Sequence, residues 1–105
     1  MGLFFILFHR DFLMPDLTPS WFVYILRCSD TSLYTGITTD LTQRLHEHNH
    51  NDKGAKYTRG RRPVSLVYQE KSVSRSEASK REYRIKKLSK KKKEQMVRDF
   101  EAFKI

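Results

Sequence analysis

The sequence predicts one α+β domain in which helices flank a small three-stranded antiparallel sheet, in the order β-β-α-β-α-α. The aromatic and β-branched runs WFVYILRC, from residue 21, and LYTGIT, from residue 33, lie on either side of a Ser-Asp-Thr-Ser turn, which is typical of a hairpin. A third run, VSLVYQE from residue 64, alternates apolar and polar residues as a half-exposed strand does.

Helical spacing accounts for most of the remaining chain. Thr39 or Asp40 can cap a helix through LTQRLHEHNH, and Ser74 can begin a second helix. The last segment carries an apolar face for docking a terminal helix, formed by Met96, Val97, Phe100 and Phe103. The glycine-containing segment NDKGAKYTRGRRP is expected to be a basic loop.

The folded domain is expected to span residues 21–105, because 105 residues suffice for one modest hydrophobic core. Residues 1–20 are expected to be an irregular extension, with Met14 favoured as the natural start over a functional tail at 1–13. The apolar run at 3–8 is too short for a signal peptide or a membrane span, so no membrane is expected. The single cysteine, Cys28, excludes an internal disulfide and fits a cytoplasmic location.

The chain is basic, with 21 Lys+Arg against 12 Asp+Glu and a formal charge of +9. This excess predicts a polyanionic partner, and two basic segments with an interleaved tyrosine favour nucleic acid, read through its backbone and by base stacking. A purely solvated charged surface is the alternative. The expected contact residues are Lys53, Lys56, Tyr57, Arg59, Arg61, Arg62, Arg84, Lys86, Lys87, Lys90 and Lys91.

Two tyrosines ten positions apart, Tyr24 and Tyr34, fall on the neighbouring strands of the predicted hairpin. By themselves they could be an ordinary cross-strand aromatic pair. Gly36, inside the second strand, marks either a bulge or a close approach of two chain segments.

Polar residues on the predicted helices complete the set. Arg44 and His48 lie one helical turn apart, and Glu77 lies at the start of a later helix, where its spacing from Ser74 also suits a capping box. A zinc site is not expected among the neighbouring histidines, since they have no cysteine partner and do not converge on one face.

The run VYILRCSDTSLYTGITTDLTQRLHEHN resembles the signature of the GIY-YIG nucleases, with FVY in place of GIY and YTG in place of YIG. The later SRSEASKREYRIKKL resembles the metal-binding helix of that family. The segment GAKYTRGRRPVSLVY is similar to its small single-domain bacterial branch, which is itself similar to the incision domain of the excision-repair nuclease. The resemblance covers roughly residues 21–93.

The resemblance implies a role for each strand residue. Tyr24 would deprotonate or orient the attacking water, for which a phenol with an ordinary pKa near 10 needs nearby positive charge. Tyr34 would hold the water or the scissile phosphate. Gly36 would keep the second strand clear of the site.

The helical residues gain roles from the resemblance in the same way. Arg44 would stabilise negative charge on the phosphate, and His48 would assist proton transfer or contact the phosphate. Glu77 would hold one divalent ion, Mg²⁺ or Mn²⁺.

The implied activity is metal-dependent endonucleolytic hydrolysis of DNA in branched, single-stranded or damaged form, with RNA as an alternative substrate. A non-catalytic nucleic-acid-binding module on the same scaffold is the competing interpretation, since many family nucleases carry a late asparagine and none follows Asn51 here. A subunit recruited by a larger repair assembly is a third.

Overall fold

The computed structural model describes residues 20–103, so the predicted extension lies outside the described residues apart from Ser20. The predicted order of strands and helices is confirmed, with one short helix added between α2 and β3. The elements are β1 (Trp21–Arg27), β2 (Leu33–Thr38), α2 (Leu41–His50), α3 (Lys56–Arg59), β3 (Ser65–Ser72), α4 (Arg75–Lys86) and α5 (Lys90–Ala102).

The sheet has the strand order β2-β1-β3, and both outer strands run antiparallel to β1. β1 takes the central place because it is the most apolar strand, and four consecutive residues from Val23 to Leu26 are buried. The β1–β2 register sets Tyr24 opposite Gly36. A bulge interrupts the β1–β3 pairing, since Ile25 pairs with Tyr68 but Leu26 pairs with Leu66.

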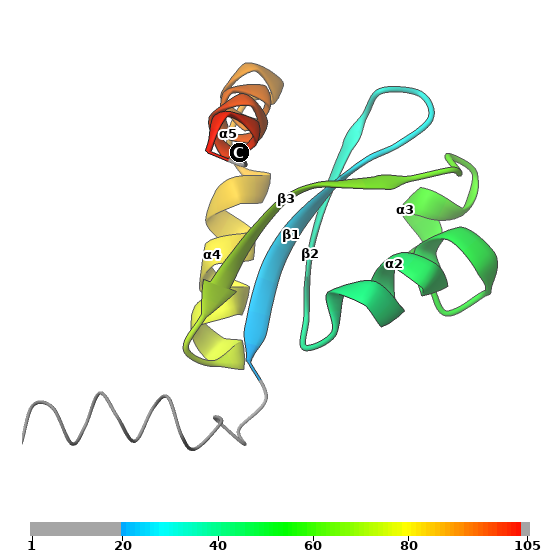
Figure 1. Ribbon diagram of the computed structural model, residues 1–105, viewed down its shortest axis with the longest axis horizontal. Helices are drawn as coiled ribbons and strands as arrows, with labels where there is room; N and C mark the ends of the chain where they lie inside the picture. Colours follow the sequence, from blue (N-terminus) through cyan, green and yellow to red (C-terminus); the bar gives the residue numbers. More distant parts are fainter. Residues whose placement is uncertain (1–19, 104–105) are drawn as a thin grey trace, which may run out of the picture.

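Helices cover both faces of this sheet, so the domain has three layers (Figure 1). Successive strand side chains point to opposite faces. Val23 and Ile25 pack beneath α4, together with Ile85. Tyr24 and Leu26 face the other way, where leucines of α2 pack against them. The central strand therefore supplies an aliphatic core to one face and the buried tyrosine to the other.

Side chains from several elements fix both ends of α2. Asp40, one of the two predicted caps, accepts a hydrogen bond from the backbone N–H of Gln43 at 3.0 Å. At the other end, the Arg62 guanidinium donates to backbone carbonyls of the last turn, including that of His48 at 2.5 Å. The side-chain amide of Asn49 exchanges two hydrogen bonds with the backbone of Val64, at 2.8 and 2.9 Å.

The last helix, α5, is docked by a polar contact as well as by its apolar face. Arg27 donates to both carboxylate oxygens of Glu94, at 2.7 and 2.9 Å. Val97 is buried, as the helical spacing predicts. Phe103 is 89% exposed, so its predicted place on the docking face is wrong: it follows the last turn as the C-cap. Within residues 20–103, no helix is long and apolar enough to cross a membrane.

The Arg27–Glu94 pair gives a prediction on stability. A double-mutant cycle with Arg27→Gln and Glu94→Gln should show a coupling of about 1 kcal/mol in urea unfolding at pH 7, reduced in 1 M salt. Hydrogen bonds from Arg27 hold the pKa of Glu94 below its usual value. The stabilisation is therefore present above the unfolded-state pKa near 4.3 and is lost as pH falls through the lower folded pKa.

The exposed pair Glu77–Lys80, at 3.5 Å with both side chains at least half exposed, is the control. Its coupling should be only a few tenths of a kcal/mol. Equal couplings for the two pairs would contradict the assigned role of Arg27–Glu94 in docking α5.

Candidate active site

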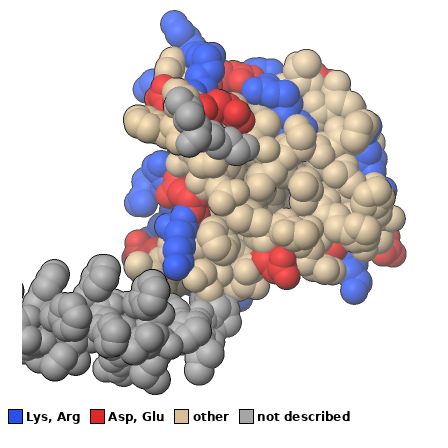
Figure 2. Space-filling model, viewed as in Figure 1, with Lys and Arg blue, Asp and Glu red and all other residues tan. Residues whose placement is uncertain are grey.

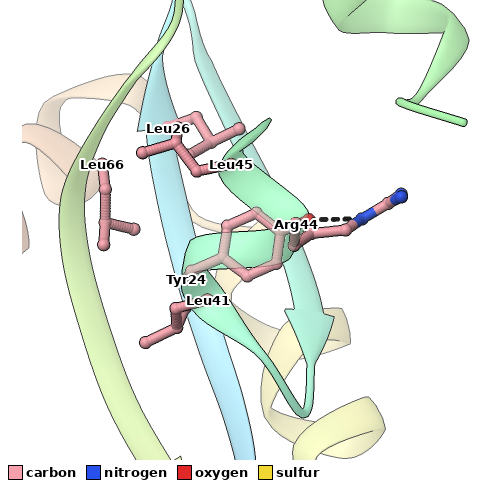
Figure 3. A pocket seen from close by; sticks show the side chains of 6 residues that line it. All are labelled: Tyr24, Leu26, Leu41, Arg44, Leu45 and Leu66. Carbon is pink, nitrogen blue, oxygen red and sulfur yellow. Dashed lines mark hydrogen bonds between the residues drawn. The ribbon is translucent and has the colours of Figure 1, made fainter. Parts of the chain in front are cut away.

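Tyr24 is the centre of the site, and its side chain is 2% exposed. Leu26, Leu41, Leu45 and Leu66 surround the ring in a shallow recess between the sheet and α2 (Figure 3). The hydroxyl end meets Arg44 on α2, whose Nε donates to the phenol oxygen at 3.4 Å, while the guanidinium extends away from the leucines. The hydroxyl is therefore held at the boundary between an apolar recess and a cationic group.

His48 lies on the same helix one turn beyond Arg44, and it is fully buried. Its Nε2 lies 2.8 Å from the Tyr24 hydroxyl oxygen. Its Nδ1 lies 2.8 Å from the Thr58 hydroxyl oxygen on α3. The rings of both tyrosines meet the imidazole in edge-on geometry, with centroids 5.9 Å away for Tyr24 and 5.3 Å for Tyr34. The structure thus brings Tyr24, Tyr34, Arg44 and His48 together.

Gly36 faces the Tyr24 hydroxyl directly across the strand pair. A Cβ atom at this position would lie 2.4 Å from the hydroxyl oxygen and 2.6 Å from the ring carbon that bears it. No side chain fits there unless Tyr24 moves. Of the two interpretations of Gly36, the structure shows the close approach; the bulge lies in the β1–β3 pairing instead.

Tyr24 and His48 are both held in their neutral forms. Burial raises the pKa of Tyr24 to about 12, which outweighs the opposing effect of Arg44. Burial and the positive charge of Arg44 lower the pKa of His48 to about 4. At pH 7 a phenol therefore faces an uncharged imidazole. Arg44 supplies positive charge that lowers the pKa of Tyr24. In the protein without substrate, burial raises that pKa by more than Arg44 lowers it.

Tyr34 connects the buried centre to the surface. Its ring stacks on Tyr57 at a centroid distance of 5.9 Å, and the Arg61 guanidinium lies 3.9 Å above the Tyr57 ring. Lys86 of α4 lies 5.9 Å from the Tyr34 ring. Since Tyr57 is 40% exposed, this series of aromatic and cationic groups reaches solvent beside the site.

Glu77 makes no contact with Tyr24 or Tyr34 among the described residues. Its backbone N–H donates to the Ser74 hydroxyl at 3.1 Å, which is one half of the capping box, and its half-exposed carboxylate pairs with Lys80. The acidic residue whose charge acts on Tyr24 is Glu82, which helps to raise the pKa of that phenol. Glu82 lies one turn from both Ala78 and Ile85, the buried residues of α4, and its side chain is only 23% exposed.

The predicted nucleic-acid contacts differ in how far their side chains are engaged within the protein. Arg59, Arg61, Arg62 and Lys90 donate hydrogen bonds within the protein, and Arg62 in particular caps α2 rather than facing solvent. Within residues 20–103, the exposed side chains of Lys56, Arg84 and Lys91 make no hydrogen bond, ion pair or ring contact. In Figure 2, Lys and Arg stand out along the flank formed by α4 and α5, whereas the face in front of the sheet carries few charges.

Sequence reasoning missed three residues of the site. Glu82 could have been found from helical phase, because it shares a face with Ala78 and Ile85. Thr58 and Asn49 gave no such signal. Thr58 lies in a segment expected to be a loop, and the partner of Asn49 is a backbone group fifteen positions away.

Comparison with known proteins agrees with this geometry. Residues 20–95 match the model of the GIY-YIG catalytic domain, so the chain belongs to the GIY-YIG family. That membership suggests a nuclease, with nucleic acid as the substrate class.

Its relatives are UPF0213 proteins, small members of the same family. The chain is 60% identical to one from Desulfotalea psychrophila over 80 residues, which are 76% of this chain and 73% of the relative. It is 54% identical to another from Bacillus velezensis, over 78% and 82% of the two chains. The solution structure of the protein EF2693 from E. faecalis matches with a TM-score of 0.56 and 47% identity, covering 81% of this chain and 90% of that one.

The contact between Gly36 and Tyr24 gives a second prediction. Gly36→Ala should lower the free energy of unfolding by about 1–3 kcal/mol, because the added methyl group overpacks a buried ring. It should also weaken the Tyr24–His48 contact, visible as a changed Tyr24 hydroxyl or His48 ring signal by NMR.

Gly60→Ala is the matched control. Gly60 has a φ of −86° and nothing within 4 Å of an added Cβ, so its replacement should change stability by less than about 0.5 kcal/mol. Comparable losses for the two variants would show that the Tyr24 ring does not require the space at Gly36.

Proposed function

We propose that the protein is a divalent-metal-dependent endonuclease that hydrolyses phosphodiester bonds in DNA. The observation that carries the proposal is the placement of the Tyr24 hydroxyl, held between the Arg44 guanidinium and the ring of a buried neutral His48. A buried structural tyrosine needs one hydrogen-bond partner, whereas here a guanidinium and an imidazole from the same helix both meet the hydroxyl oxygen.

The proposed route for the proton runs inward from the substrate. A water molecule bound with the substrate beside Arg44 passes its proton to the Tyr24 phenol oxygen while the phenol passes its own proton to Nε2 of His48 at 2.8 Å. Because the two transfers occur together, no free phenolate forms, and the raised pKa of Tyr24 is no obstacle to this route. The lowered pKa of His48 is partly caused by Arg44, and a phosphate bound to Arg44 offsets that part.

Arg44 and Tyr34 are the proposed phosphate contacts. The Arg44 side chain is 26% exposed, and its guanidinium points away from the apolar recess, so it can donate to phosphate oxygens and stabilise the charge that develops there. The half-buried Tyr34 lies beside it against the His48 ring and can orient the water or a phosphate oxygen.

Glu82 is the proposed ligand for Mg²⁺ or Mn²⁺, in place of Glu77. Mg²⁺ is commonly held by one or two carboxylates together with substrate phosphates and water. The described residues fit this pattern, since they contain no cluster of three His, Cys, Asp or Glu that would cage an ion, while the Glu82 carboxylate acts on Tyr24 and stays partly accessible. The ion, when bound, supplies positive charge against the phosphate and the leaving oxygen.

The proposed substrate is branched, single-stranded or damaged DNA, with RNA as an alternative. The exposed Lys and Arg side chains and Tyr57 suit contacts with phosphates and stacking on base faces, neither of which reads the base sequence directly. A larger repair assembly that supplies the substrate is compatible with this placement.

A non-catalytic nucleic-acid-binding module is the second candidate. The observation that favours it is that no asparagine follows Asn51, whereas many family nucleases carry a late asparagine. Cleavage assays separate the two candidates.

The test uses purified protein with branched, single-stranded and duplex DNA, with Mg²⁺, Mn²⁺ or chelator. Cleavage should require the metal and fall by at least about 100-fold in Tyr24→Phe and in Glu82→Gln. Glu77→Gln is the matched control and should retain cleavage within about threefold, since its exposed carboxylate contacts only Lys80. Loss of cleavage in Glu77→Gln with retention in Glu82→Gln would reverse the metal assignment, and binding without cleavage on every substrate supports the second candidate.

The free basic residues give a prediction on binding. Lys91→Ala and Arg84→Ala should each weaken DNA binding and reduce the slope of log K against log salt by up to about 0.9, the value for one phosphate contact. Lys71→Ala, an exposed lysine on the outer strand β3, is the control and should leave the slope unchanged. Equal slopes for all three variants would remove the α4–α5 flank from the DNA contact.

A further inference from the structure

The buried hydrogen bonds around His48 reach one residue that the proposed function does not use. Thr58, in α3, is fully buried, and its hydroxyl oxygen lies 2.8 Å from Nδ1 of His48. A buried threonine beside a buried histidine could be simple packing. The positions of the hydrogens on Tyr24, His48 and Thr58 distinguish a chemical role from simple packing.

The partners of Tyr24 determine which nitrogen of His48 carries the hydrogen. The Arg44 guanidinium can only donate, so the Tyr24 oxygen accepts from it at 3.4 Å. The hydroxyl hydrogen of Tyr24 then has one acceptor among the described residues, Nε2 of His48. If Nε2 carried a hydrogen instead, the phenol oxygen would face two donors and its own hydrogen would have no acceptor among the described residues, which is a less favourable arrangement.

The Thr58 end leads independently to the same arrangement. The Thr58 hydroxyl lies 3.0 Å from the carbonyl oxygen of Ala55, which can only accept, so the hydroxyl donates there. Its lone pairs are then left for Nδ1 of His48, and Nδ1 must be the nitrogen that carries the hydrogen. Both ends of the chain therefore place the single hydrogen of the neutral ring on Nδ1.

The backbone around Thr58 is built to hold this contact. Ala55 is the N-cap of α3, and its carbonyl also accepts the backbone N–H of Thr58 at 3.1 Å, so the threonine is fixed by both its backbone and its side chain. Gly54 lets the preceding loop lie against α2, since a Cβ atom there would be 2.8 Å from Cα of His48. The loop and α3 together form a support for one imidazole nitrogen.

We infer that Thr58 is a positioning residue that fixes the His48 ring in the tautomer with hydrogen on Nδ1, so that Nε2 faces the Tyr24 hydroxyl with a lone pair. Its catalytic consequence rests on the proposed function: with the other tautomer, His48 would donate to Tyr24 and could not accept its proton. Thr58 contacts neither the proposed water nor the phosphate and acts through His48 alone.

A second donor near Nδ1 explains what removal of the hydroxyl would do. The backbone N–H of Ala55 points at Nδ1 of His48 from 3.5 Å, a long and weak contact that is given up while Nδ1 carries the hydrogen. In Thr58→Val, the Nδ1 hydrogen loses its acceptor. The ring then gains by moving the hydrogen to Nε2, because Nδ1 can accept from Ala55 and Nε2 can donate to the Tyr24 oxygen, while the Tyr24 hydrogen turns to the water at the hydroxyl. Thr58→Ser keeps the hydroxyl and should keep the original tautomer.

The experiment reads the tautomer by long-range ¹H–¹⁵N NMR of the histidine rings in the ¹⁵N-labelled full chain at pH 7. His48→Gln identifies the His48 signals, and the exposed His46 is an internal reference for a freely exchanging ring. The wild-type protein and Thr58→Ser should show hydrogen on Nδ1 of His48, and Thr58→Val should show it on Nε2. Hydrogen on Nε2 in the wild-type protein, or an unchanged tautomer in a folded Thr58→Val, overturns the inference.

Cleavage kinetics supply the second measurement. Thr58→Val should lower kcat by about 10- to 100-fold with KM little changed, and Thr58→Ser should stay within about threefold of wild type. If Thr58→Val does not fold, the tautomers of the wild-type protein and Thr58→Ser decide. If the tautomers are as predicted but no protein cleaves any substrate, the proposed function fails and the assignment of Thr58 stands.

Discussion

The burial of one hydroxyl group is the constraint on which the site depends. The Tyr24 ring is 2% exposed, so its polar end must find partners inside the protein. It finds them on α2, where Arg44 and His48 lie one turn apart, and His48 in turn is buried and needs Thr58. Within residues 20–103 no buried side-chain nitrogen or oxygen is left without a partner. The relative placement of β1, α2 and α3 follows from satisfying this chain of polar groups.

The geometry of the site also requires two chain segments to pack closely at glycines. Gly36 leaves room for the Tyr24 hydroxyl, and Gly54 leaves room for the loop that carries α3 against α2. Neither position requires a positive φ angle, so both glycines are explained by space rather than by backbone conformation. The two glycines lie on opposite sides of His48 and allow the sheet and the loop to meet it.

Much of this architecture was predictable from sequence because it depends on local periodicity. The strands and helices, including the β1–β2 hairpin, followed from hydrophobic patterns, turn residues and caps, whereas the register that sets Tyr24 opposite Gly36 was not predicted. The roles of Thr58 and Arg62 were not predictable. Both belong to a basic segment whose composition indicates a solvated loop, and only the tertiary fold shows that it packs on the end of α2. The metal-binding role expected for Glu77 rested on the family resemblance, whereas Glu82, the ligand proposed above, lies on the face of α4 that carries its buried residues.

The hydrogen bonds at the end of α2 have a consequence for how the site is assembled during folding. Ten-residue helices are marginal on their own in water, and the last turn of α2 is completed by Arg62 and by the Asn49–Val64 exchange, which lie at the entrance to β3. A chain that has formed the β1–β2 hairpin and has not yet added the third strand lacks these bonds. We therefore expect His48 to reach its final position only when the sheet is complete, and partly folded chains to lack its contact with Tyr24.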